Sequence, residues 1–151
     1  MYEVKRVLRI LILEDYAPLC RVLAVTLQRA DCEVALVRSA CEALQVLEQH
    51  AYDTLLVDMD IANGESWKAL RALDSVHHPM PIVVLLSPGN AERQELEALG
   101  VDAILLKPVG KEALLRGIRM NVRDTSSKLG YPFSPTAYTL DGRYLSQNEK
   151  K

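Results

Sequence analysis

The sequence predicts an α/β fold built on a doubly wound, five-stranded parallel sheet. One reason is that five short apolar runs alternate with segments of helical periodicity. Another is that such apolar runs are typical of parallel strands buried on both faces. Right-handed crossovers between successive strands then place helices on both sides of the sheet. The expected strands are Val7–Leu13, Glu33–Val37, Thr54–Val57, Ile82–Leu86 and Ala103–Leu106.

Each segment between or after these strands carries a helix signal. Pro18 suits a first helical turn, and Ser39-Ala-Cys-Glu42 is a capping box. The Asn63-Gly64 pair is a turn before the third helix, Asn90 is a good N-cap for the fourth, and Gly100 is a good terminator. The predicted helices are Ala17–Arg29, a second one opening at Ser39, Glu65–Leu73, Asn90–Gly100 and Lys111–Val122.

Bulk composition excludes several classes of function. A chain of 151 residues with a formal net charge of −2 has no general attraction to nucleic acid or to anionic membranes, so we expect neither as a partner. No apolar run approaches the roughly 18 residues that span a bilayer, and the first ten residues lack a signal-peptide cleavage site. Cys20, Cys32 and Cys41 are odd in number and follow no metal-ligand spacing, which predicts reduced thiols in a cytoplasmic protein.

The chain changes character near residue 123. We expect one domain over 1–123 and a tail over 124–151 that is partly disordered or docked. Pro132 and Pro135 oppose a long helix in this tail. The segment 138–145 has the form of a short hairpin.

Polar residues follow four of the five strands at their carboxyl ends. They are Glu14 and Asp15 after the first strand, Asp58 after the third, Ser87 after the fourth and Lys107 after the fifth. In an open parallel sheet, ligands bind outside the carboxyl ends of the strands. We therefore expect these side chains to converge on one crevice.

The chemistry of this set indicates a site for a phosphoryl group. Two carboxylates at ~4 Å repel each other by about 4 kcal/mol, so three of them need a cation. Oxygen ligands in an open crevice favour Mg²⁺, or Mn²⁺. Lys107 adds a positive point, and an anion such as phosphate can bridge metal and ammonium with Ser87 as a further donor. Asp58 is then placed as a nucleophile that forms an acyl phosphate.

These residues resemble the receiver domain of two-component response regulators. Glu14-Asp15 matches the acidic pair, Asp58 the phospho-accepting aspartate, Ser87 the Ser/Thr position and Lys107-Pro108 the Lys-Pro pair, over roughly Arg6 to Val122. The resemblance implies a flavodoxin-like fold with strand order 2-1-3-4-5. It also implies that the protein is a signalling phospho-acceptor rather than an enzyme, and that its phosphoryl donor is a histidine kinase or a phosphotransfer protein.

The resemblance also implies a set of metal ligands and a partner face. Mg²⁺ would be bound by Asp15, Asp58 and the backbone carbonyl of Asp60, with Glu14 acting mainly through water. In this family the surface made by the fourth helix, fifth strand and fifth helix often meets partners, so a homodimer through that face is a further expectation. The Lys107–Pro108 peptide bond would be cis.

Three positions depart from the usual receiver pattern. Pro88 stands where a residue with an N–H normally donates to the phosphoryl group, and proline has no N–H. Ile104 replaces the usual aromatic switch residue, so an aromatic rotamer change cannot occur there. Ile61-Ala62 replaces the common Met-Pro pair. These departures indicate a competent acceptor with atypical switching.

Other functions stay open at the level of sequence. The departures also fit an interaction module that signals without phosphorylation, and so does the tail, which holds Tyr131, Phe133, Tyr138 and Tyr144. The pair Asp58 and Asp60 resembles the nucleophile motif of haloacid-dehalogenase-type phosphohydrolases, but that family has the motif on its first core strand and needs paired acids after the lysine. In a receiver, Asp60 would add negative charge near the phosphoryl group and tune its hydrolysis. The tail also loosely resembles the opening strands of some winged-helix DNA-binding domains, which would make the chain part of a longer regulator.

Overall fold

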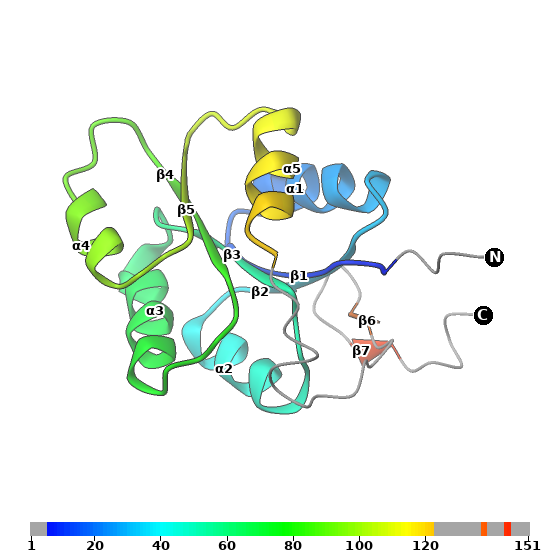
Figure 1. Cartoon of the computed structure of the whole chain (residues 1–151), viewed down its shortest axis with the longest axis horizontal. Coiled ribbons are helices and arrows are strands. Elements are labelled where there is room, and N and C mark those ends of the chain that lie inside the picture. Colours follow the sequence, from blue (N-terminus) through cyan, green and yellow to red (C-terminus); the bar gives the residue numbers. More distant parts are fainter. Residues whose placement is uncertain (1–5, 123–136, 139–143, 146–151) are drawn as a thin grey trace.

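The computed structural model describes residues 6–122, 137–138 and 144–145 (Figure 1). Its main sheet is entirely parallel, with strand order β2-β1-β3-β4-β5. This confirms the doubly wound prediction, including the expected strand order. The strands are β1 (Arg9–Leu13), β2 (Glu33–Val37), β3 (Thr54–Asp58), β4 (Ile82–Leu86) and β5 (Ala103–Leu106).

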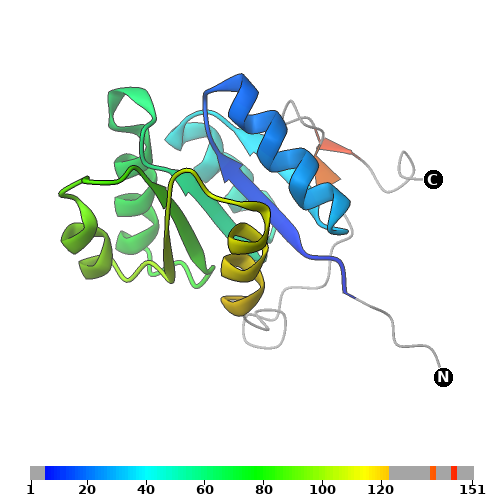
Figure 2. The ribbon, with the colours of Figure 1, turned by 90° about the horizontal axis from the view of Figure 1, so that it is seen from above.

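Helices cover both faces of the sheet because each is apolar along one side. Figures 1 and 2 show α1 and α5 together on one face, with α2, α3 and α4 on the other. Two separate cores result: Leu23 of α1 and Ile118 of α5 pack in one, while Ala43 of α2, Leu70 of α3 and Leu96 of α4 pack in the other. The helices are α1 (Ala17–Arg29), α2 (Ala40–Gln49), α3 (Glu65–Ser75), α4 (Arg93–Ala98) and α5 (Lys111–Met120).

The sheet itself is the hydrophobic centre of the molecule. All five residues of β1 are buried, and so are all five of β3, since these strands lie in the middle of the sheet with helices above and below. Burial on both faces explains the continuous apolar runs of the sequence. The buried strands therefore fix the positions of the residues at and directly after their carboxyl ends.

Several helix boundaries differ from the prediction: α3 ends at Ser75 rather than at Leu73, and α4 ends at Ala98 rather than at Gly100. α4 begins at Arg93 rather than at Asn90, because Gly89 has a positive φ of 78° and the Asn90 side chain accepts a hydrogen bond from the Glu92 N–H at 2.7 Å. This Asx-type turn delays the helix by three residues. α5 ends at Met120, two residues before the predicted Val122.

In the loop after β3, the predicted Asn63-Gly64 turn is present. Asn63 and Gly64, in the short 3-10 helix η1 (Ala62–Gly64), both have left-handed backbones with φ of 65° and 66°. Asparagine and glycine tolerate this conformation better than other residues. The turn reverses the chain so that α3 begins directly at Glu65.

Beyond α5 the structure describes two short strands, β6 (Ala137–Tyr138) and β7 (Tyr144–Leu145). They pair antiparallel, with Tyr138 opposite Tyr144. β6 comes close to β2, the edge strand of the main sheet. The rest of the predicted 138–145 hairpin and of the 124–151 tail lies outside the described residues.

Candidate functional site at the carboxyl ends of the strands

The topology brings the predicted site residues to one edge of the sheet. Asp58 is the last residue of β3, and Ser87 and Lys107 directly follow β4 and β5. Glu14 directly follows β1, which pairs with β3. Parallel register places these strand ends side by side, so residues far apart in sequence meet there.

Asp58 is held rigidly in this crevice. Its side chain is buried, with a relative exposure of 3%. Lys107 Nζ donates to Asp58 Oδ2 at 2.6 Å, and the Asp60 N–H donates to Asp58 Oδ1 at 2.8 Å. Ser66, a buried polar residue of α3, donates from Oγ to the Asp58 carbonyl oxygen at 2.5 Å. The carboxylate is therefore fixed at both oxygens and at its backbone.

Glu14 is a second buried carboxyl group beside Asp58. Its Oε1 accepts hydrogen bonds from the N–H groups of Asp15 and Tyr16 at 3.0 and 3.1 Å. Burial, followed by its contact with the Asp58 carboxylate, raises the pKa of Glu14 to about 8. Within the described residues, Glu14 Oε2 is buried without a hydrogen-bond partner. With this raised pKa, and with no described cationic side chain paired with it, Glu14 is mostly protonated at neutral pH.

Lys107 connects Asp58, the last residue of β3, with Asp60 in the loop after it. Its Nζ donates to Asp60 Oδ2 at 2.8 Å as well as to Asp58. Burial by itself would lower the pKa of the Lys107 ammonium, but the hydrogen bonds to Asp58 and Asp60 raise it above its usual value. The Lys107–Pro108 peptide bond is cis, as expected.

The side chain of Asp60 takes a role that the sequence did not reveal. Asp60 Oδ2 accepts a hydrogen bond from Ser87 Oγ at 2.5 Å, in addition to that from Lys107. The hydrogen bond from Lys107 and then that from Ser87 lower the pKa of this carboxyl group. Ser87 therefore faces Asp60 in this structure.

The remaining predicted residues lie around this centre. Asp15 follows Glu14 directly and is exposed. Ile104 of β5 is half-buried and packs against the core under α3 and α4, so it has the place of a core side chain. Pro88 is exposed and lines an apolar groove of about 670 Å³ between α1 and the loop after β5. Lys107 lines the same groove, which therefore adjoins the acidic centre.

The donor set fits a hard divalent cation. Apart from Lys107, the polar side chains that contact Asp58 offer oxygen, namely the Glu14 carboxyl group and the Ser66 hydroxyl. Over the part of the chain that the structure describes, Glu14 Oε2 is buried without a hydrogen-bond partner. Among the described residues, no three acidic, histidine or cysteine side chains form a metal-binding cluster. Mg²⁺ usually takes only one or two protein carboxylates and keeps several waters.

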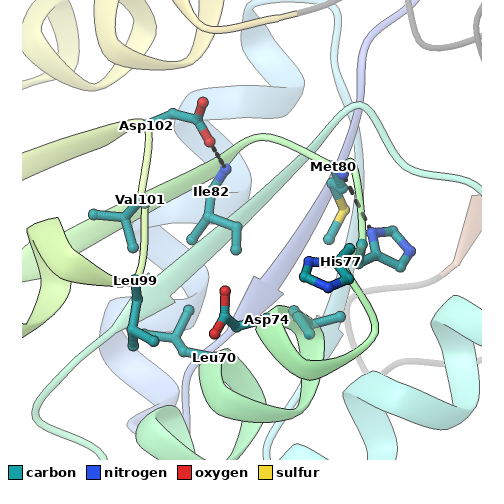
Figure 3. Close-up of a pocket in the computed structure, with 11 residues that line it drawn as sticks. Leu70, Asp74, His77, Met80, Ile82, Leu99, Val101 and Asp102 are labelled. Atoms are coloured by element: carbon teal, nitrogen blue, oxygen red, sulfur yellow. Dashed lines mark hydrogen bonds between the residues drawn. The ribbon is translucent and has the colours of Figure 1, made fainter.

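A second, smaller cavity lies at the opposite end of β4 and β5, and Figure 3 shows its lining. Its volume is about 100 Å³. Two of its polar side chains hold the backbone: Asp102 Oδ2 accepts from the Ile82 N–H at 2.8 Å, and His78 Nδ1 accepts from the Met80 N–H at 3.2 Å. Desolvation by burial lowers the pKa of His78, which favours the neutral form that this bond needs. We assign this cavity no chemical role.

The chain is similar to known proteins along most of its length. The model of the response regulator receiver domain matches residues 10–119. The virulence transcriptional regulatory protein PhoP of Salmonella typhi is 28% identical over 146 residues, which cover 95% of this chain and 65% of PhoP. The chain thus spans slightly less than two thirds of that relative.

Solved structures show the same fold. A sensor protein from Polaromonas sp. JS666 has a TM-score of 0.66 and 30% identity, covering 76% of this chain and 94% of that protein. The receiver domain of the sensor histidine kinase PA1611 from Pseudomonas aeruginosa has a TM-score of 0.69 and 23% identity, covering 77% and 98%. That structure carries a magnesium ion in its active site cleft.

The parallel sheet of order β2-β1-β3-β4-β5, with helices on both faces, is the fold of receiver domains. The chain belongs to the response regulator receiver domain family. Receiver domains are signalling phospho-acceptors that interact with histidine kinases. None of the described helices has the length and apolar character needed to cross a membrane.

Proposed function

We propose that this chain accepts a phosphoryl group on Asp58 in a Mg²⁺-dependent reaction and then changes its protein contacts. The donor is the phosphohistidine of a histidine kinase or of a phosphotransfer protein. The observation that supports this most is the buried Asp58 carboxylate, which adjoins Glu14 and lies 2.6 Å from Lys107 Nζ. We place the protein in the cytoplasm, where such donors present their phosphohistidine.

In the proposed reaction Asp58 is the nucleophile. A carboxylate oxygen of Asp58 bonds to phosphorus as the phosphorus–nitrogen bond to the donor imidazole breaks, and the imidazole leaves with that electron pair. Lys107 neutralises charge on the phosphoryl oxygens, and Ser87 offers its hydroxyl to one of them. Mg²⁺, when bound by Asp15, Asp58 and the Asp60 carbonyl, supplies further charge neutralisation. The protein's contribution is positioning and electrostatics.

The test is to incubate the protein with Mg²⁺ and acetyl phosphate, or with a phosphorylated kinase, and to measure its intact mass. We expect one phosphoryl adduct in the wild type and none in Asp58→Asn. The absence of an adduct, or its survival in Asp58→Asn, would contradict the proposal. This experiment also separates a receiver from a phosphohydrolase, which would release phosphate over many turnovers without a lasting adduct.

The output is proposed to be a change of protein contacts through α4, β5 and α5. The phosphoryl group biases a pre-existing equilibrium of the loops after Asp58 and Ser87. Leu106, the last residue of the edge strand β5, is 49% exposed. Its apolar side chain suits a contact with a partner or with a second copy of this chain. We propose protein partners rather than nucleic acid, since the formal charge is −2.

A second candidate function is an interaction module that signals without phosphorylation. The observation in its favour is that Ser87 and Lys107 already share a carboxylate ligand in this structure, the side chain of Asp60. Pro88 also removes one N–H that could have recognised a phosphoryl group. This candidate predicts that partner binding is the same in Asp58→Ala as in the wild type, and a large loss of binding would exclude it.

A further inference from the structure

We infer that the Asp60 carboxylate occupies the place of a phosphoryl oxygen in the resting chain and must be displaced when Asp58 is phosphorylated. The inference rests on the proposed function and concerns the regulation of the same site. It is carried by one atom, Asp60 Oδ2, which accepts from Ser87 Oγ at 2.5 Å and from Lys107 Nζ at 2.8 Å. These are the two side chains proposed to recognise the phosphoryl group.

Asp60 Oδ2 links residues that come from the ends of three strands. Ser87 follows β4, Lys107 follows β5, and Asp60 lies two residues beyond the end of β3. The hydrogen bond from the Asp60 N–H to Asp58 Oδ1 keeps the backbone of Asp60 beside the acceptor. The loop after β4 is thereby drawn to the centre of the site before any phosphoryl group is present.

The two anions compete for the same donors. A hydroxyl–carboxylate bond of 2.5 Å lies in the range of short charge-assisted hydrogen bonds. A phosphoryl group on Asp58 would carry its own negative charge and need the same hydroxyl and ammonium. The Asp60 side chain is 43% exposed, so it can turn to solvent without burial of its charge. Asp60 is therefore a positioning residue with two effects. It opposes phosphorylation of Asp58 by competing for Ser87 and Lys107, and it holds the loop after β4 near the site when no phosphoryl group is present.

The test uses beryllium fluoride, a phosphoryl mimic that binds carboxylates, together with Mg²⁺. Its affinity is measured by titration calorimetry for the wild type, Asp60→Asn, Asp60→Ala and Asp58→Asn. We expect both Asp60 variants to bind about tenfold tighter or more, since a charge-assisted competitor is removed. Glu48→Gln, on the exposed side of α2, removes one negative charge away from the site and is the matched control.

A double-mutant cycle distinguishes direct competition from simple charge repulsion. In the wild type, Ser87→Ala removes a hydrogen-bond donor from beryllium fluoride in the bound state and from Asp60 in the free state. The two losses largely cancel, so the affinity for beryllium fluoride should change by less than about threefold. In Asp60→Asn the Ser87 hydroxyl no longer bonds to a carboxylate at position 60 and donates to beryllium fluoride only. Ser87→Ala in this background should therefore weaken beryllium fluoride binding by about tenfold.

Each outcome decides the inference. Equal affinities in the wild type and both Asp60 variants, or the same factor for Ser87→Ala in both backgrounds, would overturn it while leaving Asp58 as acceptor. Absence of binding in every variant, with Asp58→Asn no different from the rest, would overturn the proposed function and the inference with it.

Discussion

Lys107 is the residue whose charge holds the acidic centre together. Its Nζ contacts Asp58 and Asp60 at 2.6 and 2.8 Å, and Asp58 has almost no access to water that could replace it. By contrast, the pair of Lys68 and Glu65 is exposed and its 3.5 Å contact is long, so it contributes little to stability. The two lysines therefore provide a matched comparison.

We predict that Lys107→Met lowers the free energy of unfolding by about 1.5–3 kcal/mol at neutral pH without divalent cations, since hydrogen bonds to charged groups have this magnitude. Lys68→Met should change it by less than about 0.5 kcal/mol. Urea denaturation measures both. Added Mg²⁺ should recover part of the Lys107→Met loss, and equal losses in the two variants would contradict this account of the site.

Glu14 gives the site a dependence on pH. Its pKa is raised from 4.5 to about 8 in the folded chain, so the folded protein keeps a proton that the unfolded chain has lost. Protons bound in excess by the folded state mean that stability falls as pH rises. The contribution is fully present below about pH 4.5 and is lost as pH rises through about 8.

We therefore predict that the wild type loses stability between about pH 5 and about pH 8 relative to Glu14→Gln, which carries no titrating group at this position. Urea midpoints measured across this range in a chelating buffer test the difference. A constant difference between the two proteins would show that Glu14 titrates normally.

At the scale of single elements, helix capping shows local sequence fixing a boundary. Ser39 Oγ accepts from the Glu42 N–H at 3.1 Å, as the capping box predicts. The Glu42 carboxylate, however, accepts from the Arg38 N–H at 3.0 Å. The first hydrogen bond of the capping box is therefore formed as expected. In the second, the Glu42 carboxylate accepts from the N–H of Arg38 instead of the N–H of Ser39.

We predict that Ser39→Ala destabilises the fold by about 1 kcal/mol because it removes this cap, and that Ser39→Asp retains most of the stability. Thermal unfolding of the three proteins measures the effect. If Ser39→Asp loses as much as Ser39→Ala, the hydroxyl contributes through something other than capping.

How much of each element could be predicted depended on how local its signals are. The strands and α1 follow from apolar periodicity and from Pro18, which are properties of the segments themselves. The start of α4 did not follow, since Gly89 and Asn90 form a turn whose geometry overrides the capping preference of asparagine. Helix boundaries that depend on the conformation of the preceding loop, such as the start of α4, could not be predicted from the sequence.

At the scale of the whole molecule, the parallel sheet explains why the site could be predicted at all. Strand ends in register must lie on one edge, so Glu14, Asp58, Ser87 and Lys107 were expected to converge before their contacts were known. The side-chain role of Asp60 was missed because it depends on a rotamer in the loop after β3. The role of Ser66 had a weaker signal, a polar residue on the buried side of α3.

The most direct test of the central claim is chemical mapping of the phosphorylated residue. Borohydride reduces an acyl phosphate of aspartate to homoserine, which peptide mass spectrometry can locate. After incubation with acetyl phosphate, we predict homoserine at position 58 when Mg²⁺ is present and none when it is chelated. Reduction at Asp15 or Asp60 instead, or none at any aspartate, would contradict the assignment of Asp58 as the phosphoryl acceptor.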